Sequence, residues 1–231
     1  SSATFSAAEN QTSIGTVTAT DSEGDTITFS VSGSELSITT AGVLTFDSAP
    51  DYETKSTYTA TVTASDGTNT TSQTLTITVT NVNETSPVIT SSANFSAAEN
   101  QTAIGTVTAT DADASETLTY TLTGTDAASI SITSAGVLTF NTAPDYETKT
   151  SYSVTVTVSD GTNTDTQDLT ITVTNVNDVA PVITSSATFS AAENQTSIGT
   201  VTATDRDGDS LTYSLSGTDA ASISINSSTG V

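Results

Sequence analysis

SYSVTVTVSD, at residues 151–160, alternates apolar and hydroxyl-bearing side chains without interruption. Its apolar positions are Tyr152, Val154, Val156 and Val158. A period of two with a single apolar face is typical of a β-strand that packs on one side and meets water on the other. The β-branched residues of this stretch suit such a half-buried, pleated surface. The stretch therefore predicts a strand of a sandwich rather than a helix.

The same alternation recurs along the whole chain. LTITVT, at residues 169–174, again places Leu169, Ile171 and Val173 on one face. About seven such stretches, separated by Gly, Asp, Asn and Ser turns, occur in each ~90 residues, which is the pattern of an antiparallel two-sheet domain. The sequence thus predicts an all-β chain built of seven-stranded Greek-key β-sandwiches.

The sandwich unit is repeated. ATFSAAENQTSIGTVTATD begins at Ala3, returns with two substitutions at Ala93, and returns unchanged at Ala187. A unit of ~90–95 residues is too long for a solenoid repeat and matches one small sandwich domain. We therefore expect three tandem repeats, at residues 1–86 with a shortened start, 87–180, and 181–231.

The third repeat ends at Val231, which is level with Val137 of the second. It therefore lacks about three of the ~seven strands of a sandwich, and we expect that it does not close its own core. An alternative is that another chain supplies the remaining strands by β-augmentation.

Charge is strongly one-sided. The chain carries 26 acidic residues and three cations, Lys55, Lys149 and Arg206, for a formal net charge of −23. Nucleic acid is excluded as a partner because affinity for phosphates requires clustered Lys and Arg. Anionic membrane surfaces are disfavoured for the same reason, and no apolar run is long enough for membrane insertion. In the absence of cysteine, a bound metal is the natural substitute for a disulfide staple.

Most acids recur at fixed places in the repeat. Ala-Glu-Asn stands near the start of each repeat, and two acids separated by one residue follow the second strand. Asp-Tyr-Glu lies in the middle of the repeat, Ser-Asp-Gly comes late, and Asn-Val-Asn followed by an acid closes it. These motifs resemble the calcium motifs of cadherin repeats: a Glu near the repeat start, D-x-E, the D-x-N-D-N-x-P linker, D-x-D and a late Asp. The resemblance covers the whole chain, is closest to prokaryote-type repeats of surface adhesins, and implies a cadherin-like (Ig-like) sandwich.

In that family, ligands from two consecutive repeats meet on calcium ions at the junction between them. By the resemblance, the first junction comprises Glu9, Asp51, Glu53, Asn81, Asn83 and Glu84 with Asp111, Asp113 and Asp160. The second comprises Glu99, Asp145, Glu147, Asn175, Asn177 and Asp178 with Asp205 and Asp207.

Several departures from the family pattern remove charge or ligands. The first linker acid is Asn81 or Asn175, and the second linker Asn is Thr85 or Val179. With these departures, a junction that holds two ions is an alternative to the three ions of the family.

Elementary electrostatics favours the same cation. Calcium takes about six to eight oxygen ligands from carboxylates, amides and backbone carbonyls. Thirteen of the 26 acids belong to the two junction sets, and unpaired carboxylates at that density repel one another and have raised pKa values. The alternative is that these acids only solvate the loops between strands.

The function that follows is an extracellular, calcium-stiffened spacer or stalk segment of a large repetitive surface adhesin or filament. Its partners would be the neighbouring repeats and other copies in a filament. Carbohydrate binding and homophilic cell adhesion are the alternatives, although every Phe and Tyr falls on a repeat-equivalent position expected in a core or corner. No enzyme is expected, because the chain has no His, no Cys and no G-x-S-x-G motif. Lys55 and Lys149, which follow Asp-Tyr-Glu, are expected to be counter-ions to nearby acids, with an isopeptide crosslink as the alternative.

Overall fold

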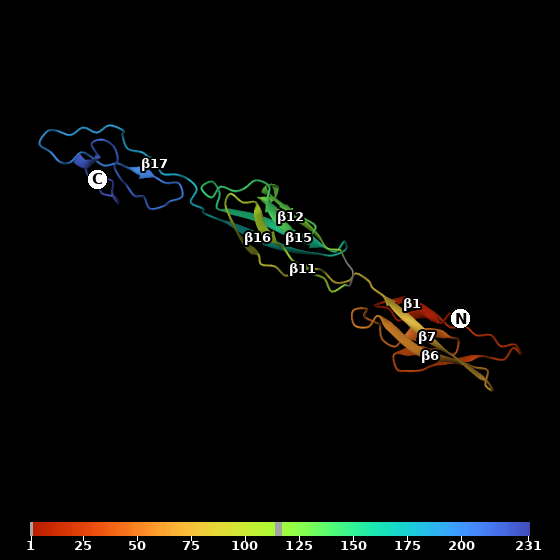
Figure 1. Cartoon of the computed structure of the whole chain (residues 1–231). Coiled ribbons are helices and arrows are strands. Elements are labelled where there is room, and N and C mark those ends of the chain that lie inside the picture. Colours follow the sequence, from red (N-terminus) through yellow and green to blue (C-terminus); the bar gives the residue numbers. More distant parts are fainter. Residues whose placement is uncertain (1, 114–116) are drawn as a thin grey trace. The chain divides into compact units, whose positions relative to one another are not determined.

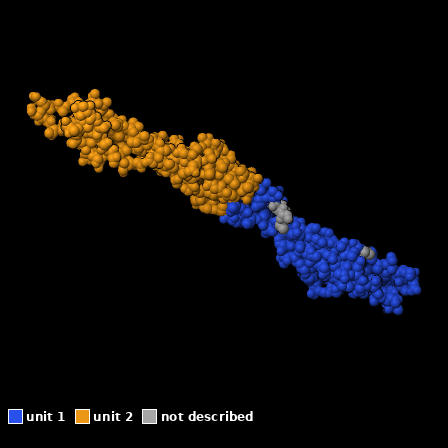
Figure 2. All heavy atoms as spheres, in the orientation of Figure 1, with its two compact units in different colours: residues 1–90, 108–119, 158–165 blue, residues 91–107, 120–157, 166–231 orange. Residues whose placement is uncertain are grey.

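The computed structural model describes residues 2–113 and 117–231 (Figure 1). By its internal contacts the chain divides into two compact units (Figure 2). Unit 1 comprises the first repeat together with two loop regions of the second, residues 108–119 and 158–165. Unit 2 comprises residues 91–107, 120–157 and 166–231. Among the described residues, no helix is long and apolar enough to cross a membrane.

The first repeat is a two-sheet sandwich of seven strands. One sheet has the order β1-β7-β6-β3, formed by β1 (Thr4–Ala8), β7 (Thr70–Thr80), β6 (Thr57–Ser65) and β3 (Thr28–Val31). The other has the order β2-β5-β4, formed by β2 (Ser13–Thr16), β5 (Val43–Phe46) and β4 (Leu36–Ile38). The first strand pairs in parallel with the last, with Phe5 opposite Ile77, whereas β6 and β7 form a long antiparallel ladder. The predicted seven-stranded sandwich is confirmed.

The core lies between the two sheets and is filled by the apolar members of the alternating strands. Leu44, Leu75 and Ile77 are fully buried, and Phe46 packs edge-on against Tyr58 with ring centroids 4.9 Å apart. The Thr and Ser residues between them face outward. This one-sided burial is the source of the period of two in the sequence.

The second repeat has the same design. Its larger sheet has the order β12-β15-β16-β9, formed by β12 (Thr119–Thr123), β15 (Ser151–Ser159), β16 (Thr164–Thr174) and β9 (Asn94–Ala98). Its smaller sheet has the order β10-β14-β13, formed by β10 (Ala103–Thr106), β14 (Val137–Phe140) and β13 (Ile130–Ile132). Two short strands pair outside these sheets: β8 (Val88–Ile89), which comes before β9, and β11 (Ala109–Thr110), which comes between β10 and β12. A 3-10 turn, η1 (Ala127–Ser129), leads into β13.

One glycine of this repeat is required by a close approach. Gly136 has φ 77°. The backbone at Val107 lies so close to it that an added Cβ would collide with the carbonyl oxygen of Val107. The carbonyl of Gly136 in turn accepts a bond from the amide of Val107 at 2.9 Å. Glycine is the residue that adopts this left-handed conformation at no steric cost.

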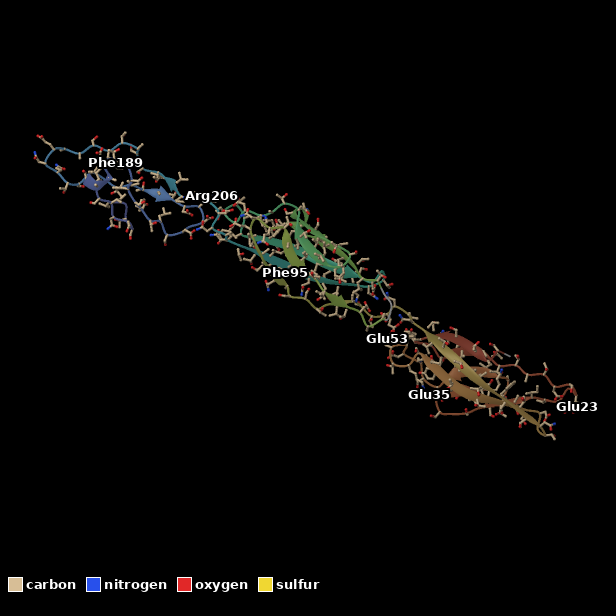
Figure 3. The ribbon with its side chains drawn as sticks, in the orientation of Figure 1. Glu23, Glu35, Glu53, Phe95, Phe189 and Arg206 are labelled. Atoms are coloured by element: carbon tan, nitrogen blue, oxygen red, sulfur yellow. The ribbon has the colours of Figure 1, made fainter. Side chains whose placement is uncertain are left out.

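The third repeat contains only the short pair β17 (Val182–Ile183) and β18 (Ala203–Thr204) and the 3-10 turn η2 (Ala220–Ser222). Its expected core residues are exposed: Phe189 (Figure 3), Ile198, Leu215 and Ile223 each show 42–46% of their surface to solvent. Their counterparts in the second repeat are buried or half-buried, as Phe95 and Ile130 are. Residues 181–231 thus do not close a core, as expected.

Both lysines are paired with acids inside their own repeats. Lys55 Nζ contacts Glu35 Oε2 at 2.6 Å and lies 4.2 Å from the centre of the Tyr58 ring. Lys149 Nζ contacts Asp126 Oδ1 and lies 4.5 Å from the centre of the Tyr152 ring. The lysines are therefore counter-ions, as predicted from their position after Asp-Tyr-Glu.

Asp126→Asn is expected to lower the free energy of unfolding by about 1–3 kcal/mol at neutral pH, because it removes the charged acceptor of Lys149. The hydrogen bond from Lys149, with that from the Ser153 amide, holds the pKa of Asp126 below its ordinary value of 3.8. A depressed folded-state pKa contributes stability that is present above the unfolded-state pKa and is lost as pH falls through the folded-state pKa. Urea unfolding curves of wild type and variant should therefore differ at pH 7 and converge in acid.

The matched control is Glu35→Gln. The Lys55–Glu35 pair is more exposed, at 41% and 57% of the two side chains, and exposed ion pairs contribute only about 0–1 kcal/mol. Equal losses for the two variants would contradict the assignment of the larger stabilisation to Asp126.

Candidate metal centres at the repeat junctions

A buried glutamate begins each of the two sites. The chain turns after the first strand through Asn10 (φ 61°) or Asn100 (φ 59°) in the left-handed conformation that Asn tolerates better than most residues. The preceding Glu9 and Glu99 are each only 2% exposed. Glu9 accepts bonds from the amides of Tyr52 and Val82 at 2.7 Å. The glutamate therefore ties the Asp-Tyr-Glu loop to the linker that leaves the repeat.

Glu99 repeats this arrangement in the second repeat. Its two carboxylate oxygens accept bonds from the amides of Tyr146 at 2.8 Å and Val176 at 2.7 Å. Tyr146 and Val176 are the second-repeat counterparts of Tyr52 and Val82, which bond to Glu9. The two sites thus start from the same local geometry.

The Asp-Tyr-Glu loop adds two more carboxylates. Asp51 accepts bonds from the Thr54 hydroxyl at 2.8 Å and the Thr54 amide at 3.1 Å, and these bonds lower its pKa below the ordinary value. Carboxylate oxygens of Glu9, Asp51 and Glu53 lie within 4.8 Å of one another. Asp51 and Glu53 of the loop, together with Glu9, therefore offer a cation three carboxylate ligands.

Asp113 connects the linker to the second repeat. It is 3% exposed, and its Oδ2 accepts bonds from the amides of Glu84 at 3.1 Å and Thr85 at 2.8 Å, and from the Thr85 hydroxyl at 2.8 Å. The same hydroxyl lies 3.2 Å from Asp111 Oδ1. Oxygens of Glu53, Glu84 and Asp113 form a second group within 4.8 Å. Linker and acidic loop thus meet within unit 1.

The late aspartate of the second repeat, Asp160, lies at the same place. Although partial burial raises its pKa, bonds from the amides of Asn163 and Thr162, both at 2.6 Å, outweigh burial and lower it. Asn163 Nδ2 donates to Asn83 Oδ1 at 3.1 Å and to the carbonyl of Thr85 at 2.9 Å. The Asp160 loop is therefore hydrogen-bonded to the linker through Asn163.

Three buried carboxylate oxygens at this first junction have no hydrogen-bond partner among the described residues: Asp111 Oδ2, Asp113 Oδ1 and Asp160 Oδ2. A buried carboxylate oxygen without a donor is costly. All three belong to acidic side chains that the sequence assigned to calcium, and carboxylate and amide oxygens are what calcium prefers. The residues of the first junction therefore fit a calcium ion.

The second junction lies within unit 2 and gathers four carboxylates. Oxygens of Glu99, Glu147, Asp178 and Asp207 lie within 4.8 Å of one another. Asp207 Oδ2 accepts bonds from the amides of Asp178 at 3.0 Å and Val179 at 2.8 Å, which repeats the role of Asp113. Burial, the charge of Glu99 and contact with Asp145 and Asp207 raise the pKa of Glu147.

Two buried oxygens of the second junction, Glu147 Oε1 and Asp207 Oδ1, also have no partner in the described part of the chain. Asp205, Asp207 and Asp209 form a further group of close oxygens. Asn175 Nδ2 donates to the carbonyl of Asp207 at 2.8 Å, and Asn177 Nδ2 donates to Asp209. This junction fits a calcium ion on the same grounds.

The structure brings together most of the residues that the sequence assigned to the junctions. Two of them make other contacts: Asp145 faces Arg206, and Asp205 Oδ1 accepts a bond from the amide of Asp207 at 2.9 Å. Asn81 is half-buried at the start of the linker. The calcium-ligand sets of both junctions stay predictions.

Sequence reasoning missed four residues of these sites: Thr85, Asn100, Asn163 and Asp209. Thr85 was treated as a lost ligand, whereas its hydroxyl binds two acidic side chains. Asn100 Nδ2 donates to Asp178 Oδ2 at 2.5 Å. Two of the four had a usable signal, because Asn163 is part of the repeated Ser-Asp-Gly-Thr-Asn motif and Asp209 continues the acidic alternation of Asp205 and Asp207.

Comparison with known proteins identifies the type of domain. Residues 92–174 match the family model described as cadherin domain. No curated protein matches the chain in sequence.

Solved structures of similar fold cover almost the whole chain. Mouse cadherin-23 EC22-24 matches with a TM-score of 0.68 and 24% identity, over 98% of this chain and 83% of that one. Human CDH23 EC21-23 matches with a TM-score of 0.72 and 21% identity, over 98% and 90%. The protocadherin gammaB7 EC3-6 cis-dimer structure matches with a TM-score of 0.76 and 24% identity, over 100% and 66%. At these identities the likeness establishes the fold.

Proposed function

We propose that the chain, whose residues 92–174 match the cadherin domain model, is a calcium-stiffened spacer segment of cadherin-like repeats. Its place is outside the cell, in a larger repetitive surface adhesin or filament of the prokaryote type, and it catalyses no reaction. Its direct partners are the adjacent repeats of the same chain.

The observation that carries the proposal is the set of partnerless buried oxygens on Asp111, Asp113 and Asp160. They come from two loops of the second repeat, and the linker they surround comes from the first. A hard divalent cation is the ligand that satisfies several carboxylate oxygens at once. Calcium, when bound, supplies that positive charge.

The residues of the chain then determine how the linker behaves. Glu9 holds the linker amide of Val82, and Asp113 holds the amides of Glu84 and Thr85. Without a cation, the gathered carboxylates repel one another across this linker. A short segment between two domains otherwise acts as a hinge, so neutralising the carboxylates is what stiffens it.

Carbohydrate binding receives no support from the aromatic residues. Sugar platforms require exposed rings, and every Phe and Tyr of the first two repeats is buried or half-buried. No observation on individual residues favours homophilic adhesion. Within the described part of the chain, no surface feature indicates another copy of the chain as its partner.

Asp113→Asn is expected to weaken calcium binding at the first junction by at least about tenfold, because it removes a charge and replaces one of two carboxylate oxygens with an amide nitrogen. Of these oxygens, Oδ1 accepts no hydrogen bond from the described chain and is the one open to a cation. Isothermal titration of the chain with calcium measures the loss. Glu23→Gln is the matched control, because Glu23 holds the place of Asp113 in the acidic motif of the first repeat and is exposed.

Solution scattering in calcium and in chelator tests the mechanical part of the proposal. The wild-type particle should be longer and less variable in calcium, and Asp113→Asn should remove much of this difference. A wild-type chain that binds no calcium, or that keeps the same dimensions in chelator, contradicts the proposal.

A further inference from the structure

The three cations of the chain are used in two different ways. Lys55 and Lys149 pair with acids inside their repeats. Arg206 instead lies at the second junction (Figure 3), where its Nη2 is 3.7 Å from Asp145 Oδ2. Asp145 opens the Asp-Tyr-Glu loop of the second repeat and belongs to the candidate calcium ligands. One junction therefore contains a positive charge of its own.

The first junction offers a direct comparison, because the motifs of the two junctions align residue by residue. Arg206 stands between Asp205 and Asp207, at the position that Ala112 occupies between Asp111 and Asp113. Asp145 corresponds to Asp51. Ala112 carries no charge. Asp51 takes part in none of the three ion pairs that the described residues form.

We propose that Arg206 is a resident counter-cation that raises the calcium concentration needed to fill the second junction. The inference rests on the proposed function, and it names a residue that sets the calcium requirement of one junction relative to the other. The chain would thus contain two junctions that fill at different calcium concentrations.

The geometry supplies the physical reason. Asp145 Oδ2 already accepts the Thr148 hydroxyl at 2.8 Å, and the guanidinium of Arg206 approaches the same oxygen. A cation that draws on Asp145 must share it with Arg206 or displace the guanidinium. Arg206 is also flanked in sequence by two further candidate ligands, so its charge repels a divalent ion held by them.

The arginine charge is permanent over the whole physiological pH range. Both side chains of the pair are about half exposed, at 57% and 49%, so salt screens the interaction. The influence of Arg206 on calcium should therefore be moderate in dilute salt and should shrink as salt is added.

Calcium titration calorimetry of Arg206→Gln tests the inference. The variant is made in an Asp113→Asn background, which silences the first junction so that the isotherm reports the second. Calcium affinity is expected to rise about three- to tenfold, which is the effect of removing one unit of positive charge several ångströms from a divalent ion. Arg206→Lys keeps the charge and is expected to stay within about twofold of the parent.

The reciprocal change provides a second, independent measurement. Ala112 is exposed, so Ala112→Arg adds the cation to the first junction without filling the core. In an Asp207→Asn background, which silences the second junction, calcium affinity is expected to fall about three- to tenfold. Circular dichroism of each variant reports whether the sandwiches remain folded.

The outcomes separate this inference from the proposed function. If the wild-type chain shows no calcium binding up to millimolar concentrations, the proposed function fails and the inference with it. If the wild type binds calcium but Arg206→Gln leaves the affinity unchanged or lowers it, only the role of Arg206 is overturned. A gain for Arg206→Gln that persists undiminished at high salt would contradict the electrostatic cause.

Discussion

Replacing Glu99 by alanine is expected to lower the free energy of unfolding of the second repeat by about 3–5 kcal/mol, in calcium and in chelator alike. The carboxylate is 2% exposed, and its two oxygens accept the amides of Tyr146 and Val176. Alanine leaves both amides without this acceptor, and each lost bond to a charged group costs about 1.5–3 kcal/mol. Thermal and urea unfolding followed by circular dichroism would measure the loss.

The chain contains its own control for this prediction. Glu193 occupies the same Ala-Ala-Glu-Asn-Gln-Thr motif in the third repeat but is exposed. Glu193→Ala is expected to change stability by less than about 0.5 kcal/mol. If Glu99→Ala were harmless in chelator but destabilising in calcium, the glutamate would act only as a metal ligand and its structural role would be wrong.

Adding calcium to the metal-free chain is expected to raise the melting temperature by about 5–15 °C. An affinity of about 10⁻⁴–10⁻³ M, as in extracellular calcium modules, gives roughly 1.4–2.7 kcal/mol per ion at about 10 mM calcium. For a domain of ~100 residues, each kcal/mol shifts the midpoint by about 4–8 °C. Differential scanning calorimetry in calcium, in magnesium and in chelator measures this shift.

Magnesium is the discriminating control for the second prediction. It demands a smaller, octahedral site and gives up its water reluctantly, so it should stabilise the chain much less than calcium at equal ionic strength. An equal shift with magnesium, or with monovalent salt of the same ionic strength, would mean that the acids are only screened. The acids would then be solvating loop residues rather than ligands.

The two predictions act on different parts of the same site. Glu99 uses both oxygens on backbone amides, whereas Asp113, Asp160 and Asp207 each keep one buried oxygen without a partner. Glu9 and Glu99 therefore shape the linker, whereas Asp113, Asp160 and Asp207 supply open coordination. This division explains why the first prediction is independent of calcium and the second depends on it.

The sequence alone was sufficient for the architecture of the repeats. In the stretch at residues 151–160, Tyr152, Val154, Val156 and Val158 all face inward on β15, because the two faces of a strand differ only in which one meets water. The repeated motifs also predicted which acids would gather, since Glu9, Asp51 and Glu53 do lie together. The local pattern is enough to predict a strand when one of its faces is buried. It is also enough to predict that acids come together when their loops lie at the same end of one domain.

Burial of individual carboxylates was decided only by the tertiary structure. Asp66 and Asp160 have the same local sequence and the same bonds to the amides of their own loops. Asp160 is nevertheless buried, at 7% exposed, whereas Asp66 is only half-buried, because Asn163 beside Asp160 meets the linker residues Asn83 and Thr85. The linker is about 80 residues away in sequence, and no local pattern reports such an encounter.

Glu99 and Glu193 make the same point at the start of the repeat. Identical motifs precede and follow them, yet only Glu99 has a closing loop and a linker that offer it amides. The sequence by itself determined the strands, the repeat and the positions of the acids, because these depend on residue type and spacing. Which carboxylate oxygens are satisfied and which remain open was determined by the tertiary structure, because that depends on donors brought from distant segments.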